Sequence, residues 1–144
     1  METPGYSGTP LAKKLGIKSG FHIRLVSEPD YYFSLFDNMP GNVAVLTEKK
    51  TRKNMIHYFT TRANVLKKDL PLLKNEIESD GMIWVSWPKK ASGVATDVTE
   101  DVIREFALRI GLVDIKVCAV DATWSGLKLV IPVKDRVPTG RKKS

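Results

Sequence analysis

Short apolar runs alternate with segments of helical periodicity along this chain, and this alternation restricts its fold more than any other feature. Met82–Ser86 is a continuous apolar run, typical of a strand buried on both faces of a parallel sheet. Helical patterns occupy 61–79 before it and Val98–Ile110 after it. Because parallel strands need crossover connections, the sequence predicts an α/β fold with helices on both faces of the sheet.

The remaining elements are predicted from periodicity and from turn residues. Short helices are expected over Thr9–Gly16 and Tyr31–Phe36, and strands over Phe21–Val26, Val43–Leu46, Met55–Phe59, Val113–Val120 and Leu127–Val133. Pro71 is expected to kink or split the helix over 61–79, and Asp80-Gly81 to end it. Asp97 is expected to be the N-cap of the following helix, since Glu100 stands three residues later.

Charge is distributed unevenly along the sequence. The segment 134–144 has five basic residues and one acid, a net +4 of the whole chain's +7. We expect one α/β domain over 1–133, large enough to bury a core, and a disordered basic tail over 134–144. Such a tail either attracts nucleic acid without sequence specificity or only keeps the protein soluble.

Few residues here suit metal or redox chemistry. Cys118 is the single cysteine and lies in an apolar run, so we expect an inert core residue and no disulfide. His22 and His57 are the two histidines, and His57 is expected to be a hydrogen-bonded core residue; no metal site is predicted. The polar first residues and short apolar runs predict a soluble, cytoplasmic protein without membrane contact.

The order of elements after residue 61 resembles the second half of class I methyltransferases. There a helix, a turn such as Asp80-Gly81, an apolar strand, an amphipathic helix ended by a glycine such as Gly111, and two strands follow one another. The resemblance covers 21–133. It implies a single Rossmann-like, mostly parallel sheet flanked by helices, with an antiparallel strand at the C-terminal end.

The cofactor loop of that family is rich in glycine and follows the first strand. In this chain Ser27–Asp30 follows the first strand, and no glycine occurs between Phe21 and Pro40. A loop without glycine cannot readily let a cofactor approach the backbone. We therefore expect no cofactor, and S-adenosylmethionine in particular is not expected to bind.

Three segments also resemble a family of small bacterial proteins known as a domain of unknown function. They are Gly5–Gly16 (GYSGTPLAKKLG), Trp87–Asp97 (WPKKASGVATD) and Trp124–Val130 (WSGLKLV). The resemblance covers nearly the whole chain and implies a single-domain bacterial protein. It implies no substrate.

Ligands of open α/β sheets bind beyond the carboxyl ends of the parallel strands. Ser27–Asp30, 60–62, Trp87–Asp97 and Asp121–Gly126 are expected at that edge. Lys89 and Lys90, before a glycine turn, could clamp an anion, although such a pair is often only solvated, and Trp87 could simply cover the sheet edge. No catalytic residue is predicted. The candidate ligand-binding residues are Trp87, Lys89, Lys90, Ser92, Thr96, Asp121, Thr123, Trp124 and Ser125.

Three functions compete. The leading hypothesis is a non-catalytic module that binds a small anionic ligand or a protein partner on a methyltransferase-like scaffold. The first alternative is an enzyme acting on an anionic or nucleotide-like substrate, with Lys89 and Lys90 as the charge clamp. The second is weak, non-specific nucleic-acid binding through the tail and the basic loop 49–53. A homodimer is a general expectation for such proteins and rests on no residue of this sequence.

Overall fold

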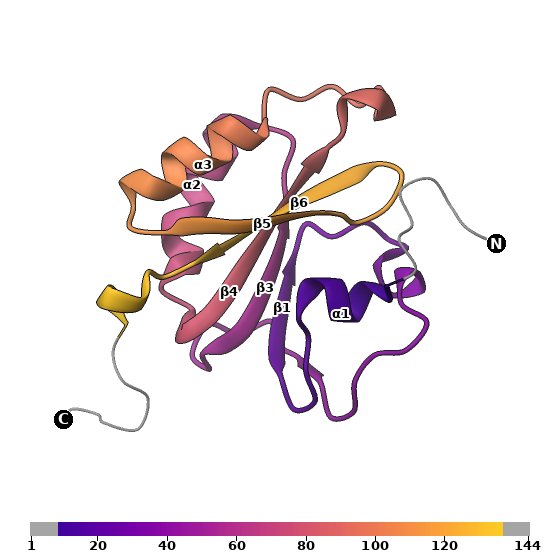
Figure 1. Cartoon of the computed structure of the whole chain (residues 1–144), viewed down its shortest axis with the longest axis vertical. Coiled ribbons are helices and arrows are strands. Elements are labelled where there is room, and N and C mark those ends of the chain that lie inside the picture. The colour runs from indigo at the N-terminus through magenta and orange to yellow at the C-terminus, as the bar shows by residue number, and fades with distance from the viewer. Residues whose placement is uncertain (1–8, 137–144) are drawn as a thin grey trace.

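The computed structural model describes residues 9–136, which form a six-stranded sheet covered on both faces (Figure 1). The strands are β1 (His22–Val26), β2 (Ala44–Val45), β3 (Lys53–Phe59), β4 (Ile77–Pro88), β5 (Val113–Ala119) and β6 (Trp124–Val130). The α-helices are α1 (Leu11–Leu15), α2 (Ala63–Lys74) and α3 (Glu100–Arg109), and the 3-10 turns are η1 (Tyr32–Leu35), η2 (Lys90–Ser92) and η3 (Val133–Asp135).

The sheet has the order β2-β1-β3-β4-β6-β5. Strands β1 to β4 pair in parallel, whereas β6 pairs antiparallel with both β4 and β5. The predicted fold class is therefore confirmed: a mostly parallel, Rossmann-like sheet with an antiparallel strand near the C-terminal end.

Neighbouring residues of the central strand β4 face the two sides of the sheet. Ile83 belongs to a core that α2 and α3 cover, while Trp84 belongs to a second core beneath α1 and η1. Both side chains are fully buried. The continuous apolar run found in the sequence thus has the expected cause, because this strand is buried on both faces.

The short helix α1 is held on the sheet by one buried hydrogen bond. The indole Nε1–H of Trp84 donates to the carbonyl oxygen of Leu15 at 2.8 Å. Gly16 follows with φ +82°, the left-handed conformation in which helices commonly end and which glycine adopts without strain. The predicted stop at this glycine is confirmed.

The second helix ends earlier than expected. It stops at Lys74 and remains continuous through Pro71, and β4 then begins at Ile77, so that Gly81 lies inside a strand. A Cβ at Gly81 would stand 2.9 Å from the carbonyl oxygen of Lys53, so this position lets β4 pass close to β3. The Asp80-Gly81 pair, expected as a helix stop, marks an irregularity in strand pairing.

Asp97 caps a different helix from the one predicted. Its Oδ1 accepts the backbone N–H of Ala63 at 2.7 Å, at the start of α2. Thr99 is the N-cap of α3, and its hydroxyl oxygen accepts the N–H of Val102 at 3.2 Å. One short segment therefore caps both helices of this face, and the sequence pattern was shifted by two residues.

Within 9–136, no helix has the length and apolar character needed to span a bilayer. The segment predicted as a disordered tail, 134–144, starts inside the 3-10 turn η3, and its residues 137–144 lie outside the described part of the chain. The same described residues contain no cluster of His, Cys, Asp and Glu able to hold a metal.

Candidate functional site

The direction in which successive strands are added to the sheet reverses between β1 and β3. From β1 the chain continues to β2 on one side of the sheet, and from β3 it continues through α2 to β4 on the other side. Such a switch point leaves a crevice beyond the carboxyl ends of the two strands, where open α/β sheets bind their ligands.

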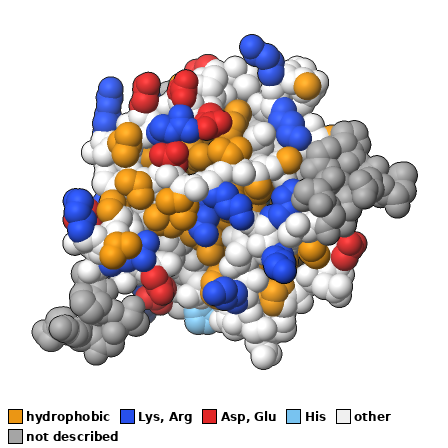
Figure 2. All heavy atoms as spheres, viewed as in Figure 1, with side chains coloured by type: hydrophobic (Ala, Val, Ile, Leu, Met, Phe, Trp, Pro, Cys, Tyr) orange, Lys and Arg blue, Asp and Glu red, His pale blue; other side chains and the backbone are white. Residues whose placement is uncertain are grey.

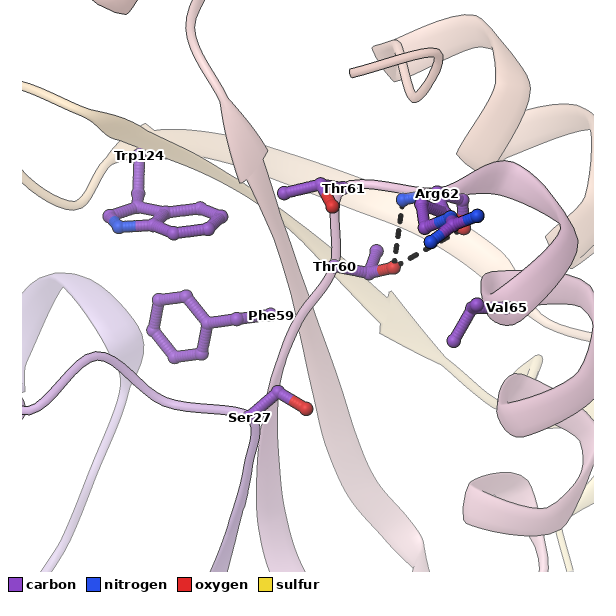
Figure 3. Close-up of a pocket in the computed structure, with 7 residues that line it drawn as sticks. All are labelled: Ser27, Phe59, Thr60, Thr61, Arg62, Val65 and Trp124. Atoms are coloured by element: carbon purple, nitrogen blue, oxygen red, sulfur yellow. Dashed lines mark hydrogen bonds between the residues drawn. The ribbon is translucent and has the colours of Figure 1, made fainter. Parts of the chain in front are cut away.

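A pocket of about 220 Å³ lies at this switch point (Figure 3). Its walls come from the end of β1, the end of β3 with its following loop, the first turn of α2 and the start of β6. The lining residues are Ser27, Phe59, Thr60, Thr61, Arg62, Val65 and Trp124.

Ser27 forms the turn that follows β1. Its φ is +59°, a left-handed conformation that non-glycine residues seldom adopt. In Figure 3 its hydroxyl points away from the Phe59 ring, toward the side of the pocket where Val65 lies. A non-glycine residue in this conformation stores strain, and such strain is concentrated at functional sites.

Phe59 and Trp124 form the aromatic wall of the pocket. Their rings meet edge to face with centroids 5.1 Å apart. Behind Phe59, the imidazole of His57 stacks on its ring at a centroid distance of 4.3 Å. The aromatic wall is therefore supported from within the sheet by a stacked side chain.

His57 is fully buried and bonded at both nitrogens. Its Nδ1 lies 2.9 Å from the hydroxyl of Tyr32, and its Nε2 lies 2.8 Å from the hydroxyl of Ser86. Burial lowers the pKa of His57 to about 3, so the ring is neutral at physiological pH. This confirms the expected hydrogen-bonded core histidine, which holds Phe59 in place.

The loop after β3 is fixed by its own hydroxyl. Thr60 Oγ1 accepts the N–H of Arg62 at 3.4 Å and donates to the carbonyl oxygen of Arg62 at 3.3 Å. The guanidinium of Arg62 is exposed and forms no ion pair with any residue between 9 and 136. A cation without a carboxylate partner thus stands at the rim of the pocket.

The turn between β5 and β6 borders the other side of the aromatic wall. Asp121 Oδ1 accepts the N–H groups of Thr123 at 2.8 Å and Trp124 at 2.7 Å, which shapes the turn. Burial raises the pKa of the Tyr31 hydroxyl, and the nearby Asp121 carboxylate raises it further. The β1–β2 connection therefore reaches across the carboxyl edge to this turn.

Only one of the nine predicted residues lines the pocket, namely Trp124. Trp87 packs against the core under α2 and α3, because alternation along β4 turns it to that face. Lys89, Lys90 and Ser92 lie in or beside η2, beyond the end of β4, and Thr96 Oγ1 donates to the carbonyl oxygen of Thr61 at 2.7 Å. Asp121, Thr123 and Ser125 lie in the β5–β6 turn and at the start of β6.

The residues that the sequence reasoning missed are Phe59, Thr60, Thr61, Arg62 and Val65, together with Ser27 as a specific contributor. The feature that brings these residues together is the order of the strands in the sheet. Loops 27–30 and 60–62 were expected at the carboxyl edge, but the strand order that makes the space between β1 and β3 the switch point cannot be read from composition. Lys89 and Lys90 were more conspicuous as charges, and the structure does not bring them to this pocket.

No family model and no curated protein matches the sequence, so the resemblance to the small bacterial family stays a prediction. Solved structures do match. A SAM-dependent methyltransferase from Aquifex aeolicus is similar with TM-score 0.61 and 14% identity, over 84% of this chain and 88% of that chain. The ribosomal protein L11 methylase from Lactobacillus delbrueckii subsp. bulgaricus gives 0.55 and 10%, over 84% and 74%.

A third similar structure is the magnesium protoporphyrin IX methyltransferase from Synechocystis PCC 6803 with bound SAH, with TM-score 0.52 and 10% identity, over 84% of this chain and 78% of that chain. At these identities the likeness shows the fold. The methyltransferase-like scaffold inferred from the order of elements is thereby confirmed.

These similarities contradict two expectations. The hypothesis of a non-catalytic module is wrong, because the similar structures are methyltransferases and agree better with the enzyme alternative. The expectation against S-adenosylmethionine is also contradicted, since structures of this fold are bound to SAM or SAH. That expectation rested on the missing glycine, but Ser27 supplies a left-handed turn after β1 without one.

Proposed function

We propose that this chain is an enzyme of the methyltransferase type that binds S-adenosylmethionine in the pocket between the carboxyl ends of β1 and β3. The observation that carries the proposal is the left-handed turn at Ser27. It stands directly after β1, at the topological switch point, and opens onto the pocket. A strained residue at the position where this fold approaches its cofactor supports a binding role rather than a packing role.

The pocket residues fit the chemical groups of this ligand. Trp124 offers a half-buried aromatic surface that suits an adenine ring or a sulfonium cation, and the buried ring of Phe59 packs against it edge to face. The hydroxyl of Ser27 suits a ribose oxygen, and the unpaired guanidinium of Arg62 suits the amino-acid carboxylate.

The size of the pocket restricts how much of the ligand it encloses. Whole-ligand sites have volumes of roughly 300–1,000 Å³. The pocket here is about 220 Å³. It would therefore hold only part of the ligand, and the rest would extend beyond the pocket.

When bound, S-adenosylmethionine supplies an electrophilic methyl group to a nucleophilic acceptor. The residues of this chain bind and orient it. The imidazole of His57 stacks on the Phe59 ring, and its buried hydrogen bonds to Tyr32 and Ser86 fix the orientation of the imidazole. A rigid aromatic wall excludes water from one side of the ligand and fixes its direction.

Binding of S-adenosylhomocysteine, measured by isothermal titration calorimetry, tests the proposal. Arg62→Gln should weaken affinity about 10- to 100-fold, because it removes a hydrogen bond between charged groups that contributes about 1.5–3 kcal/mol. Arg109→Gln, an exposed arginine in the last turn of α3, is the matched control and should bind like the wild type. A wild type that does not bind at millimolar ligand, or an unchanged affinity in Arg62→Gln, would contradict the proposed site.

A further inference from the structure

Four lysines gather on the sheet face that carries α1. They are Lys14 of α1, Lys18 after it, Lys116 of β5 and Lys128 of β6, and they are called the lysine patch below. Lys116 and Lys128 are direct cross-strand partners in the antiparallel pair. The Nζ of Lys14 donates to the carbonyl oxygen of Ala119 at 2.9 Å, which draws α1 toward β5.

No acid neutralises this patch within residues 9–136. None of its four lysines takes part in an ion pair there, and Asp114, the acid of β5, is bound by Arg104 at 3.0 Å. Burial lowers the pKa of Lys128, and the charges of Lys116 and Lys18 lower it further. In Figure 2, Lys and Arg side chains stand in the middle of this face, while the Asp and Glu side chains gather mainly at its upper left.

Such an arrangement costs stability in the isolated protein. Like charges directly opposite on neighbouring strands repel each other, and a half-buried ammonium loses hydration. An anionic partner would reverse both effects, because it supplies the missing negative charge at the same place. A polyanion with regularly spaced charges suits four ammonium groups that are spread over three elements.

We propose that the lysine patch binds the phosphate backbone of a nucleic-acid duplex. Binding of single strands relies on aromatic side chains on which the bases stack. The exposed aromatic residues among those described, Tyr31 and Phe33, lie in the β1–β2 connection and not on α1, β5 or β6. The duplex backbone needs only positive charge and hydrogen-bond donors, which the lysines have.

A membrane surface suits this face less well. Binding at a lipid surface is strengthened by exposed apolar side chains beside the cations. The exposed Val117 of β5 pairs with Leu127, a residue of the α2/α3 core, and so faces the opposite side of the sheet from Lys116. Ile115, next to Lys116 in sequence, is the other exposed large apolar residue of β5, and the described part of β6 has none. The strands of the lysine patch therefore offer little exposed apolar side chain beside their cations.

Fluorescence anisotropy of a short labelled DNA duplex, titrated with the full chain at several salt concentrations, tests the proposal. Each phosphate contact contributes about −0.9 to the slope of log K against log salt. The double variant Lys116→Gln with Lys128→Gln should lower the affinity roughly tenfold and make the slope less steep by about 1.8. Lys67→Gln with Lys68→Gln removes the same charge from exposed positions of α2 and should leave the slope unchanged.

The variant Lys116→Glu separates binding from folding. It places a carboxylate opposite Lys128, so the melting temperature should rise while the duplex affinity falls. Equal losses in the patch variant and in the α2 control would overturn the proposal, because they would show an effect of net charge alone. It would also be overturned if vesicles of phosphatidylcholine and phosphatidylserine bound through Lys116 and Lys128 while the duplex did not.

Discussion

The two faces of the sheet differ in how their side chains are covered and how their charges are paired. On the α2/α3 face, two helices of twelve and ten residues cover aliphatic side chains. Arg104 is paired there with Glu100, Asp101 and Asp114. On the α1 face, a helix of five residues covers part of the sheet, and aromatic rings, a buried histidine and unpaired lysines fill the rest. The first face covers its core with two long helices and pairs the charges around Arg104, whereas the second leaves two opposed lysines without an acid among the described residues.

This difference indicates which face of the sheet is suited to bind a ligand or partner. Satisfied packing and paired charges leave nothing for a ligand to improve. A strained Ser27 and two opposed lysines each leave a free-energy cost that binding can offset, and the exposed Arg62 has no competing carboxylate among the described residues. We therefore expect substitutions on the α2/α3 face to change stability, and substitutions on or beside the α1 face to change binding.

The largest expected effect on the free energy of unfolding comes from substitutions at two adjacent residues of β4. Ile83→Ala should lower the free energy of unfolding by about 2–5 kcal/mol, because it leaves a cavity in the α2/α3 core. Trp84→Phe removes the hydrogen bond to Leu15 but retains most of the apolar volume, so the loss should be smaller. Urea unfolding measures both. A larger loss in Trp84→Phe would show that the α1 face, and not the α2/α3 face, dominates stability.

The second prediction concerns how the protonation of His57 makes the free energy of unfolding depend on pH. The folded-state pKa is lowered to about 3, below its ordinary 6.5, so the unfolded chain binds more protons between these values. Stability is thus fully present above pH 6.5 and falls as the pH is lowered. The slope is at most about 1.4 kcal/mol per pH unit, or about 2 kcal/mol between pH 6.5 and 5.

The urea midpoint measured from pH 7 to pH 5 checks this dependence. In His57→Gln the dependence over this range should largely disappear, whatever the absolute stability of the variant. His22→Gln changes the other histidine, which is exposed, and should keep the wild-type dependence. If His57→Gln retained the full slope, another group would have to be responsible for it.

The sequence predicted the α2/α3 face better than the α1 face, for a physical reason. Helical and strand periodicity report burial against a regular surface, and so the run at Met82–Ser86 and the amphipathic pattern of α3 were recognised. The pocket depends on strand order and on one backbone angle at Ser27. Neither leaves a periodic signal, and a missing glycine was therefore taken for a missing site.

The third prediction concerns the two caps of the α2/α3 face. Asp97→Ala should destabilise the protein by about 1 kcal/mol, because the Ala63 N–H at the start of α2 loses its acceptor. Thr99→Ala should cost a similar amount through α3. Thermal unfolding of the single and double variants checks both. If Asp97→Ala had no effect while Thr99→Ala did, the α2 cap would not contribute to stability.

The smallest expected effect lies on the α1 face and has the opposite sign. Lys128→Met should stabilise the free protein by about 0.5 kcal/mol, because it removes the repulsion from Lys116 and keeps the buried apolar stem. The gain should shrink as salt is added, since salt screens the repulsion between partly exposed charges. Lys67→Met, at an exposed position of α2, should show neither the gain nor its salt dependence. A loss of stability in Lys128→Met at low salt would mean that the charged side chain of Lys128 stabilises the α1 face. The proposed contrast between the two faces would then be wrong at the position where two like charges stand directly opposite each other.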